Sequence, residues 1–142
     1  MEALRASILH CLADPGEGSK PAAWEYFEDG LLAVHDGRIV DAGPADAVRA
    51  RLPADIEVTD YAGKLIVPGF FDCHVHFPQL DFFGSYGAQV LDWWNQYAYP
   101  VEAKFADPEH AREVANAFVD ELWRRGTASA VGFGAVQALS AE

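Results

Sequence analysis

The chain has 142 residues, 51% hydrophobic and 13% aromatic, which is too apolar for a disordered protein. Its length is close to that of one average domain. The formal net charge of −12 at pH 7 argues against a nucleic acid or an anionic membrane as partner, because both would repel it.

Targeting signals and cysteine spacing give the expected compartment. No apolar run approaches transmembrane length, and the first residues lack the apolar core of a signal peptide. Cys11 and Cys73 form neither a C-x-x-C motif nor a disulfide framework, which suits a reducing compartment. The sequence predicts a cytoplasmic protein that does not bind membranes.

Residues 1–67 are expected to form a small β unit. Its clearest feature is a pair of strand-like runs, 31–35 and 38–42, around Asp36-Gly37. This dipeptide predicts a type I′ hairpin, because both central residues of that turn need positive φ. We also expect a loop at 18–21, one or two helical turns at 44–52 with Pro44 first, and two short strands within 56–69.

From residue 68 onward the pattern predicts the start of an α/β domain. A strand is expected at 70–77, then a loop at 78–87, and a helix within 88–97 that Pro100 helps to end. A second, buried strand is expected at 127–136. Because a long crossover separates the two strands, they should pair in parallel.

The best-defined helix follows Asp107, which can cap it, and stops at Gly126. Pro108 suits its first turn. Its apolar face repeats with helical spacing and comprises Ala111, Val114, Ala115, Phe118 and Leu122. The acids Glu109, Glu113, Asp120 and Glu121 should form its solvated face.

Asp72, His74 and His76 occupy alternate positions of the first strand, so their side chains should share one face. Alternate positions lie ~7 Å apart, and two imidazoles can converge from there on one ion through bonds of ~2.0 Å. Asp72 lies one step earlier on the strand and could orient the two histidines without binding the metal itself. The alternative is two histidines hydrogen-bonded inside a core, but the motif ends an apolar strand and opens a polar loop, which favours a metal site.

The stretch VPGFFDCHVHFPQ, preceded by HDGRIVDAGP, resembles the amidohydrolase superfamily. This resemblance implies a β-sandwich-like unit at 1–67 and, at 68–142, the first β-α-β portion of a (β/α)8 barrel. It implies His74 and His76 as ligands of one divalent metal, zinc or possibly iron, that activates water. It also implies a homo-oligomer, a dimer, in the complete enzyme.

Within this superfamily, Gln79 together with GSYG, QVLDWW, YPVE and KF is similar to the guanine deaminases. The resemblance implies hydrolysis of guanine to xanthine and ammonia, with Gln79 contacting the purine. An amide can both donate and accept hydrogen bonds, which suits the edge of guanine, where donors and acceptors are mixed. Gln79 could instead cap a loop. Another nucleobase deaminase, a chlorohydrolase, or a non-catalytic or oligomerising fragment remain alternatives.

Other candidate residues carry less weight. His35 and His110 are expected to be ordinary surface histidines. Trp93 and Trp94 could shape a purine pocket or simply pack in the core. Cys73, where relatives commonly carry Thr, should face helices. Ala135-Val136-Gln137 replaces a Thr-Val-His-like run of the superfamily, which affects the loop after the second strand.

Several parts of the superfamily's site have no counterpart in this sequence. The resemblance calls for two further histidines, an aspartate ligand and a proton-shuttling glutamate after the second barrel strand. Two protein ligands make a weak site, since catalytic zinc usually has at least three. We therefore expect no catalytic proton shuttle in this chain, which would be the N-terminal portion of a longer enzyme.

Overall fold

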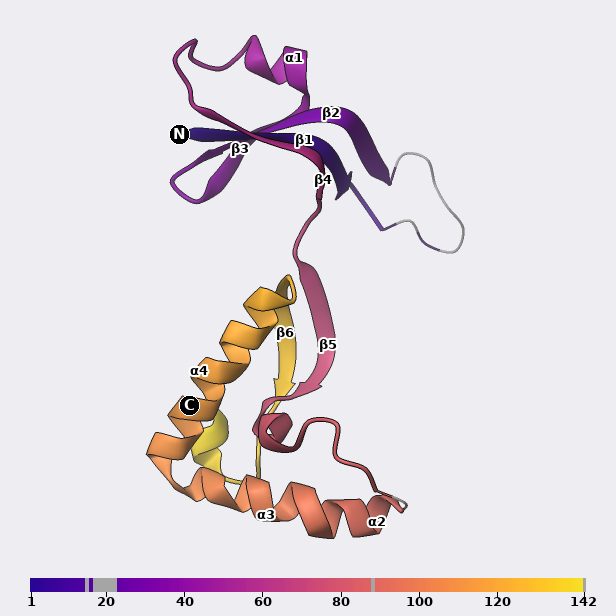
Figure 1. Ribbon diagram of the computed structural model, residues 1–142, viewed down its shortest axis with the longest axis vertical. Helices are drawn as coiled ribbons and strands as arrows, with labels where there is room; N and C mark the ends of the chain where they lie inside the picture. The colour runs from indigo at the N-terminus through magenta and orange to yellow at the C-terminus, as the bar shows by residue number, and fades with distance from the viewer. Residues whose placement is uncertain (15, 17–22, 88, 142) are drawn as a thin grey trace. The chain divides into compact units, whose positions relative to one another are not determined.

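The computed structural model describes residues 1–14, 16, 23–87 and 89–141, and it divides the chain into two compact units, Met1–Pro68 and Gly69–Glu142 (Figure 1). The predicted loop at 18–21 and the predicted helix start at Ala88 lie outside the described residues. The mixed α/β class is confirmed, because a four-stranded sheet is followed by a two-stranded parallel sheet. None of the described helices is both long and apolar enough to cross a membrane.

The first unit holds a mixed sheet in the order β3-β2-β1-β4. Its strands are β1 (Glu2–Cys11), β2 (Trp24–His35), β3 (Arg38–Pro44) and β4 (Val58–Ile66). β1 runs antiparallel to β2 and parallel to β4. The described residues of this unit form one sheet, and the second sheet that a sandwich needs is not among them.

The predicted hairpin is confirmed. Asp36 and Gly37 have φ of 50° and 71°, as a type I′ turn requires, and His35 pairs with Arg38 beside them. Helix α1 (Ala45–Arg49) follows, with Pro44 as its N-cap instead of its first residue. The core of the unit lies between α1 and the sheet and comprises Ala3, Leu31, Ala45 and Val48, with Leu52 and Ile56 packed against it.

The prediction of two short strands within 56–69 is wrong, since β4 is one strand. Its pairing with β1 shifts between Asp60 and Leu65, where Gly63 has a φ of 75°. This irregularity looks like a strand break in sequence, because glycine weakens a strand pattern. Pairing with β1 on both sides of the shift keeps the strand continuous.

The predicted strand-helix-strand unit is confirmed. β5 (Phe70–His76) and β6 (Thr127–Phe133) pair in parallel, and helix α4 (Pro108–Arg124) lies between them in the chain (Figure 1). The Asp107 side chain accepts from the backbone N–H of Glu109 at 3.0 Å, which caps α4 as predicted. Gly126, with a φ of 77°, follows its C-terminal end.

The segment between β5 and α4 is more helical than predicted. A 3₁₀ helix, Phe77–Phe82, occupies the start of the expected loop. Helices α2 (Val90–Trp93) and α3 (Tyr99–Glu102) are joined by a π-helical turn, Trp94–Ala98, and a 3₁₀ turn follows at Ala103–Ala106.

Pro100 does not end this helical run, contrary to prediction, because it lies in the first turn of α3. Proline lacks an N–H and crowds the carbonyl of the preceding turn, so an α-helix of regular pitch would be disrupted there. The π-helical turn directly before α3 changes the pitch at this point, and the run continues through the proline.

The core of the second unit surrounds Phe105, which is fully buried and clusters with the buried residues Ala111 and Val114 of α4. The prediction that the second strand is buried is wrong for this structure. In β5, Phe70 and Phe71 are 61% and 65% exposed, and in β6, Val131 is 50% exposed. Parallel strands are normally covered on both faces and flanked on both edges, and the described residues supply each of these strands with one neighbour.

Candidate active site

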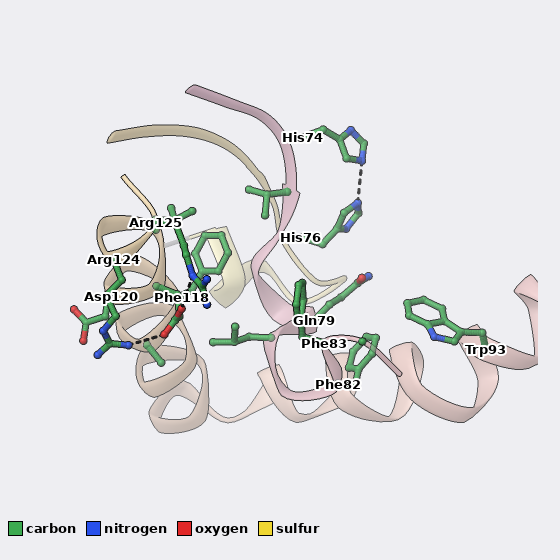
Figure 2. A pocket seen from close by; sticks show the side chains of 16 residues that line it. His74, His76, Gln79, Phe82, Phe83, Trp93, Phe118, Asp120, Arg124 and Arg125 are labelled. Carbon is green, nitrogen blue, oxygen red and sulfur yellow. Dashed lines mark hydrogen bonds and ion pairs between the residues drawn. The ribbon is translucent and has the colours of Figure 1, made fainter. Parts of the chain in front are cut away.

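His74 and His76 lie at the end of β5 and project from the same side of the strand (Figure 2). Their Nε2 atoms are 3.3 Å apart and their ring centroids 5.2 Å apart. His74 is exposed and His76 half-buried. They are therefore not core histidines, and both line the open pocket described below.

A β-bulge separates Asp72 from the histidine pair. Asp72 pairs with Ala130 and Val75 with Gly132, so β5 contains one more residue than β6 between these two pairs. Strict alternation is interrupted, and bulges commonly re-aim side chains beside functional sites. The carboxylate of Asp72 accepts from the backbone N–H of His74 at 3.0 Å, so it contacts the strand and not an imidazole.

Cys73 is exposed at this bulge, so the expectation that its side faces helices is wrong here. Like the exposed Phe70 and Phe71, it belongs to a strand that has only one neighbouring strand among the described residues.

Phe133, the last residue of β6, contacts both imidazoles. Its ring centroid lies 4.5 Å from that of His74 and 4.9 Å from that of His76, and the second pair is stacked at 17°. The sequence interpretation missed this residue. The parallel pairing of the strands was the available signal, since Phe133 is in register with His76.

The spacing of the two imidazoles fits a shared metal ion. Two nitrogens that each lie ~2.0–2.1 Å from a tetrahedral zinc are about 3.3–3.4 Å apart, which matches the Nε2–Nε2 separation of 3.3 Å. In the ranges that the structure describes, no group of three or more His, Cys, Asp and Glu side chains is arranged to hold a metal. The pair could thus supply two ligands, whereas a catalytic zinc site normally has at least three.

Gln79 lies on the 3₁₀ helix that follows β5, close to the histidines (Figure 2). Its amide Nε2 donates to Oε1 of Glu102, on α3, at 3.1 Å, and both side chains are partly buried. The sequence interpretation missed Glu102, although it is the last residue of the quoted YPVE stretch. The hydrogen bond joins residues 23 positions apart, so no local pattern could have indicated it.

An open pocket of about 1020 Å³ brings the two histidines, Gln79 and Trp93 together (Figure 2). Trp93 packs edge-on against Phe82 at 5.2 Å and donates from Nε1 to the Ser85 carbonyl at 3.1 Å. Trp94 is not among the lining residues and packs against Tyr99. Of the two tryptophans, Trp93 is thus the one placed to shape the pocket.

The far side of the pocket is formed by the C-terminal part of α4, where charged side chains gather (Figure 2). Arg124 donates to Glu121 at 2.6 Å, and this hydrogen bond lowers the pKa of the Glu121 carboxyl. Asp120 is exposed there, as predicted for this face of the helix. Arg124 and Arg125 both pair with Glu121, and the histidine end of the pocket is mainly aromatic.

The two histidines that the sequence places at the surface, His35 and His110, differ in how far they are exposed. His35 is exposed, with Nε2 3.6 Å from the Asp36 carboxylate, and the prediction is confirmed. For His110 it is wrong: the ring packs edge-on against Phe105 at 5.1 Å, and its buried Nε2 has no hydrogen-bond partner among the described residues. A position in the first turn of a helix did not reveal this packing.

The comparisons agree with the geometry. Residues 65–141 match the Amidohydrolase family. The chain is 41% identical over 121 residues to the guanine deaminase of Escherichia coli and 39% identical over 138 residues to a probable guanine deaminase of Deinococcus radiodurans. These matches cover 85% and 94% of this chain but 28% and 31% of the relatives, so the chain spans about three tenths of their length.

Solved structures give the same result. The structure of Escherichia coli guanine deaminase superimposes with a TM-score of 0.87 at 37% identity, over 99% of this chain and 33% of that one. The family match includes both histidines and Gln79, and the structural match extends over both units. The chain therefore belongs to the amidohydrolase family, as a homologue of its guanine deaminases.

Proposed function

We propose that this chain is part of an enzyme that hydrolyses guanine to xanthine and ammonia with the help of one divalent metal ion. The observation that carries the proposal is the pair of imidazoles, with Nε2 atoms 3.3 Å apart, beside Gln79 in one pocket. Similarity to guanine deaminases supports the choice of substrate.

In this proposal, residues 1–67 belong to a β-sandwich-like unit and residues 68–142 begin a (β/α)8 barrel. β5, α4 and β6 would be its first strand, helix and second strand, which places the histidines at the carboxyl end of a strand, where catalytic groups of such barrels lie. The exposed faces of β5 and β6 would then be covered by later parts of the barrel. The complete enzyme would be a cytoplasmic homodimer.

His74 and His76 would hold the metal, most simply zinc, with iron as the alternative. When bound, such an ion acts as a Lewis acid that makes water a usable nucleophile at neutral pH. Phe133 contacts both rings, stacking on that of His76, and restricts their rotation, and Asp72 fixes the backbone of His74. The remaining ligands and the group that transfers protons would come from residues outside this chain.

Gln79 would bind the purine through its amide, and the aromatic side chains of the same pocket would contact the flat ring. Phe82 and Trp93 offer apolar surface on the Gln79 side of the pocket (Figure 2). Aromatic packing and one oriented amide are a common way to select a flat heterocycle with polar edges.

The proposal is tested on the complete enzyme by measuring ammonia release from guanine and the metal content of the purified protein. We expect His74→Ala with His76→Ala to lose both metal and activity. His35→Ala, which changes an exposed histidine in the other unit, is the matched control and should keep both. A double variant with full metal content, or an enzyme that releases ammonia only from another heterocycle, would contradict the proposal.

A further inference from the structure

We infer that Glu102 is a positioning residue that fixes the amide of Gln79, so that Gln79 presents its carbonyl oxygen, a hydrogen-bond acceptor, to an N–H donor of the substrate. This inference rests on the proposed function, because it assumes that Gln79 meets a purine. It adds the direction of the hydrogen bond and the residue that sets it.

The contact joins two separate elements around the pocket. Gln79 lies on the 3₁₀ helix after β5, and Glu102 is the last residue of α3. Their side chains meet at 3.1 Å and are partly buried. Gln79 lines the pocket and Glu102 does not, so Glu102 supports Gln79 from outside the space available to a ligand.

The chemistry of the two groups fixes the amide. An ionised carboxylate only accepts hydrogen bonds, whereas the two ends of an amide have nearly the same shape and opposite roles, one donating and the other accepting. Gln79 must therefore turn its NH₂ group toward Glu102. Its carbonyl oxygen is then the end left for another partner, and the reversed orientation would oppose two acceptors.

The substrate edge that fits is one with a hydrogen-bond donor. Guanine carries such donors, including its exocyclic amino group. A site whose acceptor is held in place discriminates against an edge that offers only acceptors, because the partly buried carbonyl would then stay unpaired beneath the ligand. Without Glu102 both orientations of the amide would be populated, and part of the protein would present the wrong group.

The test uses the complete enzyme and a charge swap. Glu102→Gln keeps the shape but allows either orientation, so we expect KM for guanine to rise about tenfold, with kcat within about threefold and metal content unchanged. In the double variant Gln79→Glu with Glu102→Gln, the new amide must donate to the new carboxylate, which again presents only oxygen. We expect this swap to restore KM to within about threefold of wild type.

Glu113→Gln is the control, since it makes the same chemical change at an exposed position of α4 outside the pocket. An unchanged KM in Glu102→Gln, or a swap no better than that single variant, would overturn the inference. If Glu102→Gln does not fold, the double variant alone tests the inference. A KM for guanine in the double variant more than tenfold above that of the wild-type enzyme would then refute the inference. A wild-type enzyme inactive on guanine would instead refute the proposed function.

Discussion

Replacing Phe105 by Ala should strongly destabilise the second unit. The side chain is fully buried, and it packs edge-on against Phe77 at 5.6 Å and His110 at 5.1 Å. Truncation of a core Phe to Ala costs about 3–5 kcal/mol, and the loss of two aromatic contacts places this site toward the upper end. Because Phe77 directly follows His76, the loss should also loosen the site.

Equilibrium unfolding in guanidinium chloride, followed by the helical circular dichroism signal, measures the effect. With a denaturant slope of roughly 2–6 kcal/mol per molar, the expected loss lowers the midpoint by about 0.5–2.5 M. Phe83→Ala is the control, since Phe83 is 91% exposed and its loss should leave the midpoint nearly unchanged. Equal midpoints for the two variants would show that the core of this unit does not depend on Phe105.

Three further predictions concern the substrate contact, pH and the isolated chain. Gln79→Ala should lower kcat/KM for guanine by a factor corresponding to about 1–3 kcal/mol, and wild-type kinetics would reject its contact with the purine. The hydrogen bond from Arg51 lowers the pKa of Asp41 in the folded protein. This pair therefore stabilises the fold at pH values above the ordinary carboxyl pKa of about 4, and the stabilisation is lost as the pH falls through the lowered pKa of Asp41. Arg51→Ala should therefore lower the unfolding midpoint more at pH 7 than at pH 2, and equal losses at both would contradict the assignment. Residues 1–142 alone should release no ammonia from guanine and should associate through the exposed strands, which an active, monodisperse monomer would disprove.

Features governed by neighbouring residues could be predicted from the sequence. The hairpin follows from the positive φ of Asp36-Gly37, and the ends of α4 follow from the cap at Asp107 and from Gly126. Parallel pairing of β5 and β6 follows from the long crossover between them. The spacing of His74 and His76 likewise places both rings on one side of a strand. Each of these outcomes depends on a few consecutive φ, ψ preferences or on a simple period.

Only the tertiary structure decided the features that join distant residues. Phe133 reaches both imidazoles because β6 returns beside β5, and Glu102 reaches Gln79 because α3 packs against the 3₁₀ helix. The bulge after Asp72 and the continuity of β4 depend on hydrogen bonds to a partner strand. The identity of such partners is fixed by packing and by the need to pair backbone groups, and neither is encoded in the residues on either side of a position.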